Sequence, residues 1–138
     1  MKPHLKEAEQ TLRLAVRDIE AFEVLQEAPG VHSSIVCFHA QQAIEKSLKA
    51  VLFLSEIEFR RTHSLTVLAE LLHQHKINAP VADDQLERLN PYPVTLRYGD
   101  DIEIELISSD AAAGMVMRIY QCAEQLVQAA IAKPKPPN

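Results

Sequence analysis

Glycine and proline are scarce in this chain, which has 3 of the former and 8 of the latter among its 138 residues. Collagen and low-complexity disordered chains are rich in both, so these classes are excluded. The two cysteines, Cys37 and Cys122, are too few for a disulfide scaffold, and both lie in apolar helical patterns. We therefore expect two buried thiols in a reducing compartment, which places the protein in the cytoplasm.

An excess of cationic residues and long apolar runs are also lacking. Lys and Arg number 14 against 19 Asp and Glu, so the net charge is −5. Binding of nucleic acid through bulk positive charge is thereby excluded, and any phosphate-binding patch must be local. The first residues do not resemble a signal peptide, and no stretch is long and apolar enough to span a membrane. We expect no membrane association.

Good helix formers, above all Ala, Leu, Glu and Gln, make up much of the chain. Apolar residues recur at spacings of three and four, which predicts helices from residue 5 to near Pro29-Gly30, over about 33–55, from residue 65 to before Asn78, over 83–89 and over 112–130. Polar and apolar residues alternate over 100–107, a pattern that fits a short strand or an extended loop. We interpret it as a loop, because no other segment offers a pairing strand. The fold class is therefore predicted to be all-α, an up-and-down antiparallel bundle of four to five helices.

The predicted bundle forms one domain over residues 1–132, and the proline-rich residues 133–138 are expected to fray. The third helix is expected to be capped by His63 or Ser64. Ser109 or Asp110 is the expected cap of the last helix.

Five polar residues share one stripe of the predicted second helix, about 120° wide at 100° per residue. They are His39, Gln42, Glu45, Lys46 and Lys49. Ile35, Phe38 and Phe53 fall inside the same stripe, although a solvated face does not normally carry three large apolar groups. We therefore expect another element, or the second subunit of a homodimer, to cover this stripe. A solvated face is the alternative.

Two further segments contain polar residues that could belong to a functional site. In the first, Arg97 can bind a phosphate through two parallel hydrogen bonds, and Tyr98 offers a stacking face for a base. The alternative is that Arg97 pairs with a nearby carboxylate and that Tyr98 fills an edge of the core. The second segment is Arg-Arg-Thr-His over residues 60–63, for which a polar loop and a helix cap are the alternative.

Together these segments resemble the HEPN family of small helical proteins. The resemblance is carried by FHAQQAIEKSLKAVL at 38–52, RTHSL at 61–65 and LNPYPVTLRYGD at 89–100, and it extends roughly over residues 5–131. It implies an all-α bundle that is often dimeric. It also implies a nucleotide or RNA ligand and, as partner, a minimal nucleotidyltransferase in a toxin–antitoxin-like pair.

The main hypothesis is a module that binds a nucleotide or RNA with a defined set of side chains. The expected ligand-binding residues are His39, Gln42, Glu45, Lys46, Lys49, His63, Arg97 and Tyr98.

Two alternatives remain open. Many HEPN proteins are ribonucleases, and the nuclease branch carries an Arg followed, after four to six residues, by a His. No Arg of this chain precedes a His at that spacing. A metal-independent ribonuclease toxin would therefore need another acid–base group, such as His39 or His63. The second alternative is a purely structural dimer, in which the polar stripe is an internal hydrogen-bond network.

No metal or cofactor is expected. His73 and His75 lie two residues apart on a helix, so their side chains diverge by about 160°. The acidic residues of segment 100–105 are interpreted as a solvated loop. No glycine-rich phosphate motif, Cys-x-x-Cys pair or nucleophilic serine motif is present.

Overall fold

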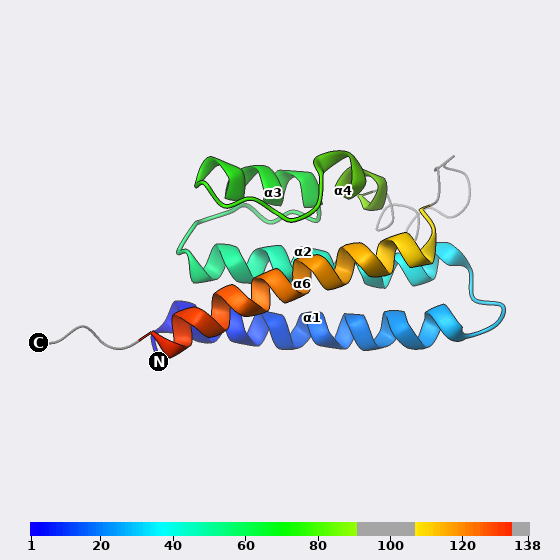
Figure 1. Cartoon of the computed structure of the whole chain (residues 1–138), viewed down its shortest axis with the longest axis horizontal. Helices are drawn as coiled ribbons and strands as arrows, with labels where there is room; N and C mark the ends of the chain where they lie inside the picture. The colour runs from blue at the N-terminus through cyan, green and yellow to red at the C-terminus, as the bar shows by residue number, and fades with distance from the viewer. Residues whose placement is uncertain (91–106, 134–138) are drawn as a thin grey trace, which may run out of the picture.

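The computed structural model describes residues 1–90 and 107–133, and within these ranges it contains five helices and no strand (Figure 1). The helices are α1 (Pro3–Glu27), α2 (Ser33–Leu54), α3 (Leu65–Gln74), α4 (Asp83–Leu89) and α6 (Ser109–Ala132). The predicted all-helical bundle is therefore confirmed. Arg97, Tyr98, the acidic segment 100–105 and the tail from residue 134 lie outside the described residues.

The three long helices α1, α2 and α6 lie side by side, and α1 runs opposite to the other two (Figure 1). Helices α3 and α4 lie on the far side of α2 from α1 (Figure 1). Segment 55–64 runs back along α2, because the amide of Ile57 binds the carbonyl of Leu52 while His63 contacts Gln41. As a result, α3 begins beside the middle of α2 and follows the direction of α2. None of the described helices is long and apolar enough to cross a membrane.

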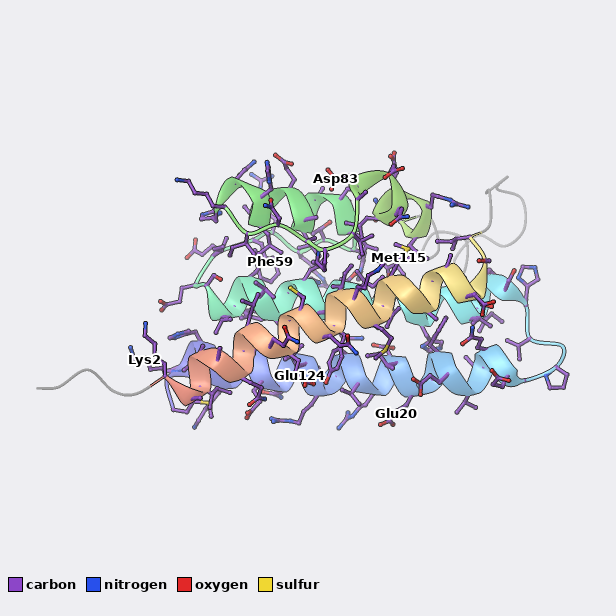
Figure 2. All side chains as sticks on the ribbon, viewed as in Figure 1. Lys2, Glu20, Phe59, Asp83, Met115 and Glu124 are labelled. Atoms are coloured by element: carbon purple, nitrogen blue, oxygen red, sulfur yellow. The ribbon has the colours of Figure 1, made fainter. Side chains whose placement is uncertain are left out.

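Helix α2 is the centre of the molecule, since more than half of its residues are buried. Its small side chains, among them the fully buried Ala40 and Ala43, let its neighbours approach closely. The apolar stripe of α1, which ends at the buried Phe22, packs against it as the periodicity predicts. Cys37 is buried as expected, whereas Cys122 is only partly buried, so the prediction of two buried thiols was wrong for Cys122. Side chains project from the helices into the space between them (Figure 2).

The start of α3 agrees with the sequence, whereas the start of α6 differs by one residue. Ser64, one of the two expected caps, accepts a hydrogen bond from the amide of Val67 at 3.3 Å. Helix α6 is capped by Ser108, which accepts from the amide of Ala111 at 3.2 Å, so the prediction of Ser109 or Asp110 was wrong. The buried Ile107 directly precedes Ser108, and this apolar anchor fixes which of three consecutive polar residues becomes the cap.

Helices α2 and α3 end in the same way. Glu56 and Lys76 adopt left-handed backbone conformations, with φ of 55° and 64°. The next residues, Ile57 and Ile77, donate their amides to carbonyls five residues earlier, at 2.9 and 3.0 Å. This pattern closes a helix and usually contains glycine at the left-handed position. Here two charged residues take that position.

Candidate functional site

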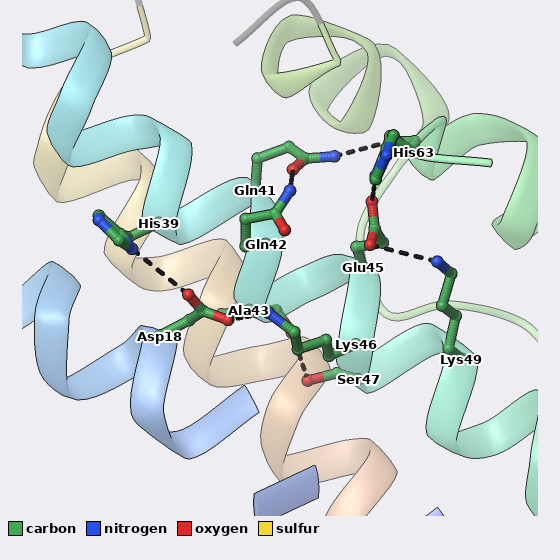
Figure 3. Close-up of polar contacts among 10 residues, drawn as sticks. All are labelled: Asp18, His39, Gln41, Gln42, Ala43, Glu45, Lys46, Ser47, Lys49 and His63. Atoms are coloured by element: carbon green, nitrogen blue, oxygen red, sulfur yellow. Dashed lines mark hydrogen bonds and ion pairs between the residues drawn. The ribbon is translucent and has the colours of Figure 1, made fainter. Parts of the chain in front are cut away.

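The polar stripe of α2 is divided between two neighbours, one on each side of the helix (Figure 3). Toward α1 lies a group that we call the α1 cluster: Asp18, His39 and Lys46. Toward the chain that leads into α3 lies the α3 cluster: Gln41, Glu45, Lys49 and His63. The stripe is therefore covered by elements of the same chain rather than fully solvated.

In the α1 cluster, one carboxylate binds both basic groups. Asp18 comes from the core-facing side of α1, and its Oδ1 lies 3.3 Å from Nδ1 of His39. Its Oδ2 accepts a hydrogen bond from Nζ of Lys46. The side chains of Asp18, His39 and Lys46 are 15%, 28% and 26% exposed. The cluster therefore links α1 to α2 and engages two of the predicted ligand residues in an internal contact.

In the α3 cluster, the carboxylate is more deeply buried and the histidine is more open. The Glu45 side chain is 5% exposed, and its Oε1 lies 2.8 Å from Nδ1 of His63. Its Oε2 lies 3.2 Å from Nζ of Lys49. The imidazole of His63 is 50% exposed. Since Nδ1 faces the carboxylate, Nε2 is the ring nitrogen that a ligand can contact.

A fully buried glutamine completes the α3 cluster. Nε2 of Gln41 donates to the backbone carbonyl of His63 at 2.7 Å, and its Oε1 accepts from Gln42 at 2.6 Å. His63 is thus held both by its backbone and by its ring. Sequence reasoning missed Gln41 and also Asp18. The available signal was the same for both, namely a polar residue on the apolar side of a predicted helix, which must find a buried partner.

The three apolar residues of the stripe differ in how they are covered. Phe53 is partly buried, and its ring lies 5.3 Å from that of Phe59 in the segment before α3. Phe38 is also partly buried against the core. Ile35 remains 40% exposed. The chain itself thus covers much of the surface for which a second subunit was considered, and the homodimer stays a prediction.

An open groove lies beside the α3 cluster, between residues 58–62 and the outer face of α3. Its volume is about 780 Å³, and Arg60, Arg61 and the partly buried ring of Phe59 line it. Nζ of Lys49 lies 5.9 Å from the centre of that ring, a cation–π contact that joins the groove wall to the α3 cluster.

A separate titratable pair lies on α6. The hydroxyl of Tyr120 donates to Oε2 of Glu124 at 2.5 Å. Burial, and then the hydrogen bond and negative charge of Glu124, raise the pKa of Tyr120 to about 12.

Within residues 1–90 and 107–133, no group of three or more His, Cys, Asp or Glu side chains is arranged to hold a metal ion.

The structure therefore sorts the predicted ligand residues into sets. His39 and Lys46 meet at Asp18, whereas Glu45, Lys49 and His63 meet on the other side of α2. Gln42 reaches the second group through the amide of Gln41. Arg97 and Tyr98 lie outside the described residues, so their role stays a prediction.

Comparison with known proteins gives consistent results. The sequence model of the HEPN domain family matches residues 4–133. A protein of Methanocaldococcus jannaschii named "Putative toxin MJ1304" is 34% identical over 74 residues, which cover 54% of this chain and 47% of that protein. The match thus spans about half the length of this curated relative. The crystal structure of ST0689, an archaeal HEPN homologue, has a TM-score of 0.61 at 23% identity, over 92% of this chain and 99% of that chain, and thus shares the fold.

Proposed function

The chain belongs to the HEPN domain family, and on that premise we propose that it binds a nucleotide or RNA as one member of a toxin–antitoxin-type pair. The similarity to a protein named as a toxin supports membership of such a pair. The observation that carries the ligand proposal is the half-exposed imidazole of His63, which the buried carboxylate of Glu45 holds in place at 2.8 Å.

The α3 cluster suits a ligand better than the α1 cluster does. His39 and Lys46 share Asp18, and neither side chain is more than 28% exposed, so this cluster presents no open basic group. His63 is 50% exposed and is already oriented, so binding costs little ordering entropy. Lys49 shares Glu45 with His63 and lies beside Phe59 of the groove, so it adds a cation on the same side of α2. In a chain of net charge −5, such a local group of donors is what phosphate binding requires.

The direct test is binding of a short single-stranded RNA and of 5′-AMP over a series of salt concentrations. Lys49→Ala and His63→Ala should weaken binding. Lys46→Ala makes the same change of charge on the same helix and is the matched control, which should bind like the wild type. Absence of RNA and nucleotide binding by the wild-type protein would rule the proposal out.

We further propose a homodimer and a minimal nucleotidyltransferase as protein partner. The exposed Ile35 on the polar stripe of α2 supports a contact between subunits. Light scattering measures the oligomeric state, and a monomer at every accessible concentration would contradict the homodimer.

Co-purification with the product of the neighbouring reading frame tests whether a nucleotidyltransferase is the partner. A dimer that binds neither RNA nor nucleotide would favour the purely structural alternative.

A metal-independent ribonuclease is the second candidate function, and the Glu45–His63 pair favours it. An imidazole whose Nδ1 faces a carboxylate can accept a proton at Nε2, as a general base must. RNA cleavage in the presence of a chelator, lost in His63→Gln and retained in His39→Gln, would support this function. Binding without cleavage would leave the protein a non-catalytic module.

A further inference from the structure

We infer that residues 59–63 form a preformed loop in which Arg60 and Arg61 bind the phosphate of the ligand. Neither arginine belongs to the expected set of ligand residues. This inference rests on the proposed function, because it names the groups that receive the phosphate of a nucleotide or of RNA.

Both ends of this loop are fixed to α2 by three side chains that lie one helical turn apart. Gln41 binds the carbonyl of His63 at 2.7 Å, and Glu45 lies 2.8 Å from the ring nitrogen of the same residue. One turn further, the ammonium of Lys49 lies 5.9 Å from the ring centre of Phe59. Phe59 and His63 are therefore anchored, and the residues between them are presented to solvent from a fixed frame.

The arginines between these anchors are exposed, and neither forms an ion pair within the part of the chain that the structure describes. The two lysines of the polar stripe, Lys46 and Lys49, differ in that each binds a carboxylate. Both arginines line the same groove, and a phosphate bound there would gain the attraction of two positive charges. Each guanidinium can also give a phosphate two parallel hydrogen bonds.

The neighbouring groove has room for the rest of the ligand. Its volume of about 780 Å³ lies within the usual range of roughly 300–1,000 Å³ for small-molecule sites. Val67 and Leu71 give it an apolar wall on which a sugar or base can lie. Its carboxylates, Glu58, Glu70 and Asp83, repel a phosphate. The phosphate is therefore expected at the arginines rather than at the parts of the groove that these carboxylates line.

The test compares two double variants of the full-length protein. Arg60→Gln/Arg61→Gln removes the proposed phosphate-binding groups. Arg13→Gln/Arg17→Gln removes the same charge from two exposed arginines of α1. Binding of a short single-stranded oligouridylate, of 5′-AMP and of inorganic phosphate is measured over a salt series, and thermal melting verifies that both variants are folded.

The first variant should bind about tenfold or more weakly, as expected for charged hydrogen bonds. The salt dependence of oligouridylate binding should also fall by about 0.7 in log–log slope for each phosphate that the variant no longer neutralises. The control should retain both properties. A stronger effect on oligouridylate than on 5′-AMP would identify the phosphate as part of RNA, and the reverse result as part of a free nucleotide.

Three results would overturn the inference. Equally weakened binding in both double variants would mean that only overall charge matters, and unchanged binding in both would mean that the loop does not bind phosphate. In both cases, RNA or nucleotide binding by the wild-type protein would leave the proposed function intact. A wild-type protein that binds none of the three probes would overturn the inference and the proposed function together.

Discussion

The two clusters of α2 contain the same chemical groups, yet the structure arranges them differently. Each has one carboxylate that contacts one histidine and one lysine. In the α1 cluster, exposure is nearly even, and no side chain is more than 28% exposed. In the α3 cluster, the 5% exposed carboxylate of Glu45 holds a histidine that is 50% exposed. The evenly and mostly buried α1 cluster joins two helices, whereas the α3 cluster, with its half-exposed imidazole, can present a ligand-binding atom.

The largest expected effect is on stability and concerns the α1 cluster. Asp18→Asn leaves Lys46 and His39, each about three quarters buried, without a counter-charge. We expect the free energy of unfolding to fall by roughly 2–3 kcal/mol, below the 3–5 kcal/mol of a fully buried pair because water still reaches both partners. Urea unfolding measures the change, and RNA binding should persist. Glu20→Gln, at an exposed position of the same helix, is the control.

In the α3 cluster, the matching change is Glu45→Gln, and it should affect RNA binding more than stability. Glu45→Gln also leaves a mostly buried lysine, Lys49, without a counter-charge, but the half-exposed His63 stays hydrated, so we expect a somewhat smaller loss of stability of roughly 1–2 kcal/mol. Affinity for RNA should fall, because the imidazole is no longer held by a charge. If Glu45→Gln destabilised the protein more than Asp18→Asn and left binding unchanged, the distinction between the clusters would be wrong.

Replacing Lys46 or Lys49 also tests the difference between the two clusters, through a smaller effect on the salt dependence of RNA binding. Lys49→Met should lower the salt dependence of RNA binding by about 0.7 in log–log slope if Lys49 contacts one phosphate. Both lysines bind a carboxylate, but Lys46 lies on the α1 side of α2, away from His63 and the groove, so Lys46→Met should leave that slope unchanged. Methionine preserves most of the aliphatic stem in both variants, so a difference between them reports the charge. Equal slopes would show that the ligand does not distinguish the two sides of α2.

The smallest effect concerns a phenol on α6, which belongs to neither cluster. Since the pKa of Tyr120 is raised to about 12 from 10.0, the fold favours the neutral phenol. This contribution to stability is complete below pH 10 and is lost as the pH rises from 10 to 12. An absorbance titration should show one late phenol, which is absent in Tyr120→Phe and titrates earlier in Glu124→Gln. A late phenol that persists in Tyr120→Phe would assign the shift to another tyrosine.

Much of the fold could be predicted because apolar spacing is a property of each helix alone. The short helix over 83–89 was predicted with its observed bounds, and α2 was predicted to within one residue. The start of α6 was placed one residue too late, because three consecutive polar residues can each act as a cap. Only the packing of Ile107 decides between them.

The candidate site could be predicted only in part, because its contacts join distant segments. The helical period placed five polar residues on one stripe, but no periodicity shows that Asp18 lies opposite two of them, 21 and 28 residues away. The role of Gln41 depends likewise on the path of segment 55–64, which brings the carbonyl of His63 within 2.7 Å. Contacts of this kind require the tertiary structure.

The two left-handed turns at Glu56 and Lys76 bear on how the protein could adapt to heat. A side chain in this conformation costs about 1 kcal/mol that glycine would not incur, and the chain has only 3 glycines. Replacement of either residue by glycine would therefore raise stability, and selection for heat resistance could favour these changes. Neither residue belongs to a cluster of α2, so such gains could accumulate while the ligand-binding surface stays under separate selection.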